Sequence, residues 1–139
     1  MPTLTESFSV PNADQSWAVI TDLNKLIPCV PGATVVDAAG PQSATAEITV
    51  NMGSMGMKFK GPVTIESVNG QTATIKANTR EAGGQSNAAG DVTISMSGSQ
   101  VNISAVANVS GKAASMGEGT VVAVLTQLVK QFAGNLAKA

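Results

Sequence analysis

The chain has 139 residues, 43% of them hydrophobic, which fits one globular domain with a single core and leaves no room for a second domain. Eight basic and nine acidic residues give a formal net charge of −1, and the lone Arg80 stands among scattered lysines, so the composition argues against a nucleic-acid partner. The absence of histidine and tyrosine removes two common catalytic groups, and the single cysteine, Cys29, excludes an intramolecular disulfide and suits a reducing cytoplasm.

The N-terminal part of the sequence predicts one strand followed by two short helices. Residues 4–10 alternate in hydrophobicity as a strand does, and Pro11 ends the run. Asn12 and Gln15, three residues apart, have the spacing of a helix capping box. Asp22 is placed to cap a second helical turn, which the prolines and the glycine after it bring to an end.

The middle of the sequence has the hydrophobic period of two that is typical of half-buried strands. The period begins at Ala33, and the clearest runs cover residues 44–52, 57–65, 73–77, 92–96 and 101–109. Glycine-containing turns separate the runs at Gly53–Gly56, Asn69-Gly70, Gly83-Gly84 and Ser97-Gly98-Ser99. Adjacent hairpins of this kind predict an antiparallel meander, and with the first strand we expect about seven strands.

The C-terminal part of the sequence predicts one long amphipathic helix from about Ala113 to Lys138. Its apolar residues recur every three or four positions, at Val121, Leu125, Leu128, Phe132 and Leu136. At ~1.5 Å per residue, such a helix is long enough to lie across a whole curved sheet. We therefore predict an α+β fold of helix-grip type over residues 1–139, in which a curved antiparallel sheet of about seven strands surrounds a long C-terminal helix, with two short helices after the first strand.

The carboxylates are scattered along the chain and give no catalytic or metal-binding pattern. Glu47, Glu66 and Asp91 fall at outward positions of predicted strands, and strand alternation offers no convincing inward ionisable group. Cys29 has no histidine to activate it, so we interpret it as a structural thiol. We expect no catalytic residues, no metal site and no enzymatic activity.

The methionines suggest an adaptable apolar pocket between the sheet and the long helix. Thioether side chains repack easily around apolar shapes, but they also fill gaps in ordinary cores, and the residues alone leave both interpretations open. The candidate ligand-binding residues are Ile27, Met52, Met55, Met57, Phe59, Ile75, Ala77, Met96, Met116, Val121, Leu125 and Leu128. The glycine-rich loop that holds Met55 is the expected mouth of this pocket.

Three segments resemble one known family over essentially the whole chain. They are Pro28-Cys29-Val30-Pro31-Gly32-Ala33, Met57-Lys58-Phe59-Lys60-Gly61 and Val109-Ser110-Gly111-Lys112. Together they resemble the G subunit of carbon monoxide dehydrogenase (CoxG), a family that looks like the START-type lipid-transfer proteins of the SRPBCC superfamily. The resemblance implies a helix-grip fold, association with a molybdenum-containing carbon monoxide dehydrogenase or a related oxidoreductase, and a link from that enzyme to the membrane and its quinone pool.

Three functions follow as hypotheses. The first is a cytoplasmic carrier with no covalent cofactor that encloses a lipid or a quinone, either menaquinone or ubiquinone. The second is a ligand-free adaptor that docks an oxidoreductase at the inner face of the membrane, by peripheral contact. The third, which we rank last, is a small hydrolase or cyclase. Family members often continue into a membrane-attaching tail beyond the long helix, whereas this sequence ends at Ala139, which leaves membrane attachment open.

Overall fold

The computed structural model describes residues 3–52, 55–81, 83–84, 86–111, 115 and 117–139. Among these residues, seven strands form one antiparallel sheet in the order β1-β7-β6-β5-β4-β3-β2. The strands are β1 (Thr3–Ser9), β2 (Ala33–Gly40), β3 (Ser43–Met52), β4 (Met55–Asn69), β5 (Thr72–Glu81), β6 (Ser86–Ser97) and β7 (Gln100–Gly111). The helices are α1 (Ala13–Ile20), α2 (Leu23–Leu26), the 3₁₀ helix η1 (Ile27–Cys29) and α3 (Glu118–Lys138).

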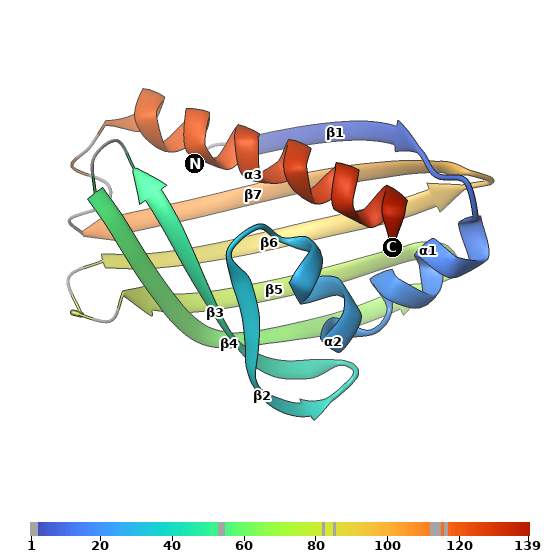
Figure 1. Ribbon diagram of the computed structural model, residues 1–139, viewed down its shortest axis with the longest axis horizontal. Helices are drawn as coiled ribbons and strands as arrows, with labels where there is room; N and C mark the ends of the chain where they lie inside the picture. The colour runs from blue at the N-terminus through green and yellow to red at the C-terminus, as the bar shows by residue number, and fades with distance from the viewer. Residues whose placement is uncertain (1–2, 53–54, 82, 85, 112–114, 116) are drawn as a thin grey trace.

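The two short helices begin at side-chain caps that the sequence predicts. The Asn12 side chain accepts a hydrogen bond from the backbone N–H of Gln15 at 3.1 Å, and the Asp22 side chain accepts one from Asn24 at 3.0 Å. Each cap satisfies one of the amide donors that a helix leaves unpaired at its first turn. These short helices follow β1 and precede β2 in the chain, and they lie at one end of the sheet (Figure 1). Their apolar residues join the larger core group there.

The sheet curves because β4 bends near Gly61. A Cβ atom at this position would lie 2.8 Å from the Cα of Thr79 on β5 and closer still to the carbonyl oxygen of Asn78, so the strands can approach only where glycine stands. Figure 1 shows β3 and the first part of β4 swinging away from β5 to cross the sheet at an angle. The bend turns the sheet into a shallow half-barrel with one concave face.

Helix α3 crosses the concave face of the sheet but makes most of its contacts at the margins of that face. Its main contacts are with the edge strand β1, with β3, and with α1 and η1, rather than with the central strands (Figure 1). The helix begins at Glu118 rather than near Ala113, since Gly117 has a φ of 95°, which no helical residue adopts. Ala113 itself lies outside the described residues.

Two groups of buried apolar residues fill the interior. The larger group joins α1, α2, η1 and the C-terminal turns of α3 to the sheet, and its most buried members include Ile20, Leu23 and Leu136. The smaller group contains Val50, Met57 and Phe59 of the β3–β4 hairpin, with Val124 and Leu128 of α3 packed against it. This arrangement confirms the predicted α+β helix-grip fold with a curved antiparallel sheet, two short helices after the first strand, and a long C-terminal helix.

Candidate functional site

An apolar cavity of about 250 Å³ lies between α3 and the concave face of the sheet. Its wall is made by Leu23, Leu26, Ile27, Val30, Ala33, Ala46, Ile48, Val63, Ile75, Ala77, Thr79, Val92, Ile94, Ile103, Ala105, Leu128, Val129 and Phe132. Among the described residues of this wall, Thr79 alone has a polar side chain. Its hydroxyl donates a hydrogen bond to the carbonyl oxygen of Ala88 at 2.7 Å and is therefore already engaged.

Small side chains keep the cavity open. Strands β5 and β7 contribute Ala77 and Ala105 at inward positions, directly below the part of α3 that holds Leu128 and Phe132. Neither alanine reaches far enough to fill the space that the helix leaves by resting on the edge of the sheet. A cavity of this kind, concave and lined by aliphatic carbon, is typical of sites for apolar molecules.

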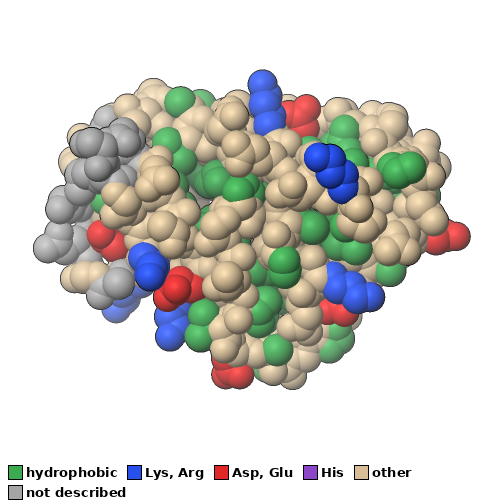
Figure 2. Space-filling model, viewed as in Figure 1, with side chains coloured by type: hydrophobic (Ala, Val, Ile, Leu, Met, Phe, Trp, Pro, Cys, Tyr) green, Lys and Arg blue, Asp and Glu red, His purple; other side chains and the backbone are tan. Residues whose placement is uncertain are grey.

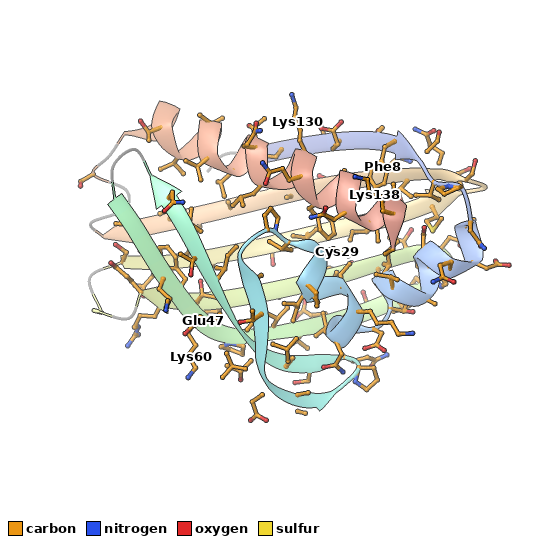
Figure 3. The ribbon with its side chains drawn as sticks, in the orientation of Figure 1. Phe8, Cys29, Glu47, Lys60, Lys130 and Lys138 are labelled. Carbon is orange, nitrogen blue, oxygen red and sulfur yellow. The ribbon has the colours of Figure 1, made fainter. Side chains whose placement is uncertain are left out.

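The segment Pro28–Ala33 closes one end of the cavity, and a hydrogen bond joins this segment to α3. Gly32 has a φ of 78°, and a Cβ atom there would lie 2.7 Å from the carbonyl oxygen of Thr49, so only glycine lets this segment lie against β3. The side-chain amide of Asn135 on α3 donates a hydrogen bond to the carbonyl oxygen of Cys29 at 2.8 Å. Figure 3 shows Cys29 close to α3. Burial raises the pKa of the Cys29 thiol, which favours its protonated form.

A second hollow, which we call the outer groove, lies between α3 and β3 and has a volume of about 570 Å³. Its lining residues are Pro31, Gly32, Thr49, Val50, Asn51, Ala123, Val124, Gln127, Leu128 and Gln131. Leu128 belongs to the walls of both hollows, so this one side chain stands between the inner cavity and the outer groove. Figure 2 shows this face of the molecule, with hydrophobic side chains reaching the surface beside α3.

The structure brings four of the predicted site residues together around the inner cavity. They are Ile27, Ile75, Ala77 and Leu128. The other described candidates are buried or half-buried in different places, none of them in the wall of the inner cavity. Met57 and Phe59 lie in the smaller core group, Met96 lies in the larger one, Val121 is buried and Leu125 is half-buried on α3. The side chains of Met52 and Met55, and Met116 as a whole, lie outside the described residues.

Most cavity residues that the sequence analysis did not select share a detectable signal. Ala46, Ile48, Val63, Val92, Ile94, Ile103 and Ala105 occupy the inward positions of their strands, and Phe132 belongs to the apolar stripe of the helix. Thr79 continues the inward series of Ala77 on β5, so alternation alone places it in the wall. Ala33 on β2 shares the inward face of its partner Ile48. The positions of Leu23, Leu26 and Val129 depend on how the short helices and α3 are turned, and Val30 lies between η1 and β2, so no local pattern specifies these four.

The carboxylate of Glu81 corrects the expectation that no ionisable side chain faces inward. Glu81 ends the inward series of Thr79 on β5, and its Oε1 atom is buried with no hydrogen-bond partner among the described residues. Its Cα pairs with that of Phe59 across the β4–β5 ladder, away from the wall of the inner cavity. Strand alternation would have identified this position.

Glu47, Glu66 and Asp91 lie on the outer face, as the sequence predicts, whereas Glu6 on β1 shares the face of its partner Ile103 and lines a hollow beside α3. Lys58 pairs with Glu47 at 3.9 Å, and Lys76 lies 3.6 Å from Glu66 and 3.9 Å from Asp91, all with exposed or half-exposed side chains. Such pairs contribute little to stability. Within the described part of the chain, no three His, Cys, Asp or Glu residues are close enough to hold a metal ion. No described helix has the length and apolar character needed to cross a membrane.

Comparisons with known proteins agree on the family and the fold. A family model for the G subunit of carbon monoxide dehydrogenase (CoxG) matches residues 7–139. A conserved protein from Geobacillus kaustophilus has a similar structure, with a TM-score of 0.76 at 16% sequence identity, covering 98% of this chain and 91% of that one. No protein with a curated description matches the sequence.

Two further solved structures are similar over nearly their whole length. A protein from Thermus thermophilus has a TM-score of 0.67 at 11% identity, with 99% of this chain and 95% of that chain covered. The Zhui aromatase/cyclase from Streptomyces sp. R1128 has a TM-score of 0.65 at 9% identity, with coverages of 99% and 92%. At these identities the likeness concerns the fold alone.

Proposed function

The chain belongs to the CoxG family, the G subunit of carbon monoxide dehydrogenase, and from this membership and its inner cavity we propose that it is a non-catalytic binding protein for an apolar ligand. The ligand is a lipid or a quinone, such as menaquinone or ubiquinone, held between α3 and the sheet without a covalent cofactor. The observation that carries the proposal is the apolar wall of the cavity, in which Thr79 alone of the described residues has a polar side chain, already engaged with Ala88.

The energetics of this wall favour a ligand with a hydrocarbon part. Burial of apolar carbon contributes ~0.8 kcal/mol per methylene, so several methylenes give useful affinity with no charged anchor. A charged group placed among Ile75, Ile94 and Leu128 would lose its hydration without gaining a partner. The inner cavity therefore suits an alkyl or isoprenoid chain better than a polar metabolite.

The family supports a partner as well as a ligand. We propose that the protein works beside a molybdenum-containing carbon monoxide dehydrogenase or a related oxidoreductase, at the cytoplasmic face of the membrane, and passes a hydrophobic molecule between the two. Binding of a ligand and docking on an enzyme are compatible roles. A ligand-free adaptor remains the alternative that the family description favours, and it would have a dry, closed interior in the purified protein.

Extraction of the purified protein tests whether it carries a ligand. Native mass spectrometry after gentle purification should show a mass above that of the polypeptide, and organic extraction should release a lipid or quinone. Protein that is ligand-free by both methods, and that takes up no added ubiquinone or menaquinone analogue, would favour the adaptor.

A cavity-filling variant tests whether the ligand lies in the inner cavity. In Ala105→Phe the ring would occupy the space below α3, so we expect loss of the co-purifying ligand with little loss of stability. Ala38→Phe on the exposed part of β2 is the matched control and should keep its ligand. Equal ligand content in the two variants would place the ligand elsewhere.

Turnover assays address the hydrolase or cyclase alternative. The fold likeness to an aromatase/cyclase and the inward carboxylate of Glu81 make the question specific. We expect no saturable conversion of ester or polyketide-like substrates by the metal-free protein. Conversion that Glu81→Gln abolishes would replace the binding proposal with an enzymatic one.

A further inference from the structure

We propose that the outer groove is the headgroup site of the bound molecule and that it selects amphiphiles with an uncharged, hydrogen-bonding head, such as a ketone, an ester or an alcohol. This inference rests on the proposed function, since it assumes that the inner cavity holds the apolar part of the same ligand. The groove adjoins the cavity at Leu128, which lines both. A chain that passes this side chain has its tail inside and its head in the groove.

The polar side chains of the groove are all uncharged. Gln127 and Gln131 on α3 line the groove beside an apolar floor that includes Val50 and Val124, and β3 borders it on the other side at Thr49 and Asn51. A side-chain amide both donates and accepts hydrogen bonds, so the two glutamines can satisfy a carbonyl oxygen or a hydroxyl. Gln127 and Gln131 are one helical turn apart and therefore present their amides on the same side of α3.

Charged side chains near the groove are directed elsewhere. None of the described residues that line the groove is ionisable. Lys130, which lies between the two glutamines in sequence, lines a different hollow on the β1 side of α3, together with Phe8 and Glu6. Lys58, on the strand next to Thr49, is paired with Glu47 on the outer face. A carboxylate or phosphate head in the groove would thus find amides to bind but no cation.

The rim opposite α3 is joined by hydrogen bonds both to β3 and to α3. Gly32 accepts a hydrogen bond from the backbone N–H of Thr49 at 3.1 Å, which joins the Pro31–Gly32 segment to β3. The same segment is tied to α3 through the hydrogen bond from Asn135 to Cys29. The groove is therefore bordered by two elements that are linked to each other at one end, while Leu128 stands at its inner limit.

A charge series at Gln127 tests the inference with two probes of equal chain length, decan-1-ol and decanoate. Affinities are measured at pH 8 by displacement of the neutral dye Nile red. The quantity compared between variants is the ratio of decanol to decanoate affinity. The two probes partition differently into any apolar site, and this difference cancels when the ratios of two variants are compared. Gln71→Glu and Gln71→Lys, in the exposed turn between β4 and β5, are the matched controls.

The expected shifts in this ratio are opposite in sign. Gln127→Lys places an ammonium beside the head and should lower the decanol preference by about three- to fivefold, whereas Gln127→Glu should raise it by a similar factor. Both controls should leave the ratio within twofold of the wild-type value, which corresponds to a free-energy difference of about 0.4 kcal/mol. Circular dichroism checks that each variant is folded.

The outcomes separate the two proposals. If both probes bind the wild type and the ratio does not respond at Gln127, the head lies outside the groove and the inference is wrong, while the binding function stands. If neither probe displaces the dye from folded wild-type protein, the proposed function and the headgroup site are both overturned. A ratio that shifts equally in the Gln71 controls would show a long-range charge effect and would also overturn the inference.

Discussion

The two ends of α3 are held in different ways. In the C-terminal turns, Phe132, Ala133 and Leu136 are buried, with Leu136 at 0% exposure, and Asn135 is hydrogen-bonded to Cys29. In the preceding turns, residues 121–131, Val121 is buried, Ala123 is exposed and the other apolar side chains are half-buried. Leu128 and Val129 line the inner cavity, and Ala123, Val124 and Leu128 line the outer groove. One helix thus serves as an anchor at one end and as a cover at the other.

This difference follows from what lies beneath each end. Below the C-terminal turns, the short helices fill the space between α3 and the sheet with residues such as Val19 and Ile20. Below the middle of the helix, the strands offer small residues such as Ala77 and Ala105, and a cavity remains. Tight packing fixes the fold, and incomplete packing leaves room for a ligand.

The sharpest test of the comparison removes the same side chain volume from each end. Leu136→Ala should lower the free energy of unfolding by about 3 kcal/mol, because the buried site leaves a cavity when it is truncated. Leu125→Ala, at a half-buried position on the covering part, should lower it by about 1 kcal/mol or less. Urea denaturation measures both values. Equal losses would show that the two ends are packed alike.

The bend in β4 is the second test, since it brings the β3–β4 hairpin under the covering end of α3. Gly61→Ala should destabilise the protein by about 2 kcal/mol, because the added methyl group overlaps the backbone of β5 at Asn78 and Thr79. Gly90→Ala on β6 is the control, because its nearest neighbour would be the Val106 carbonyl oxygen at 3.8 Å. We expect the control to be neutral or slightly stabilising. Similar urea midpoints for the two variants would mean that the bend tolerates a side chain.

Removal of the hydrogen bond between α3 and η1 should weaken the anchored end alone. Asn135→Ala leaves the Cys29 carbonyl oxygen without this partner, a loss of about 1 kcal/mol that alanine's higher helix propensity offsets in part. Helix propensity affects stability but does not change the exposure of Cys29. The deciding measurement is therefore the alkylation rate of Cys29 in the folded protein, which should rise. Lys138→Ala, exposed on the same helix, should leave that rate unchanged.

The smallest effect concerns pH and the same thiol. Burial raises the pKa of Cys29 in the folded protein, so the unfolded chain, with a thiol pKa of about 8.5, ionises first as the pH rises. The stability that wild type owes to this thiol is therefore complete below about pH 8.5 and is lost above it. We expect the difference in unfolding free energy between wild type and Cys29→Ala to shrink from pH 8 to pH 10. A difference that stays constant would mean that Cys29 is not sheltered by the anchored end.

Local patterns predicted most of the fold because they depend on neighbouring residues only. The caps at Asn12 and Asp22 and the alternation along the strands required no knowledge of the rest of the chain, and the structure confirms them. The pocket was harder to predict. Ile75 and Ala77 were found from alternation, yet Met57 and Phe59, on inward positions of the neighbouring strand, lie in the smaller core group instead.

The sequence by itself determined the order of elements and the faces that each element buries. Only the tertiary structure decided where the interior stays open. That outcome depends on the bend at Gly61 and on α3 resting on the edge of the sheet, with Leu128 between cavity and groove. Periodicity tells which side chains point inward, whereas the distance between a helix and the sheet beneath it is set by contacts among residues far apart in the chain.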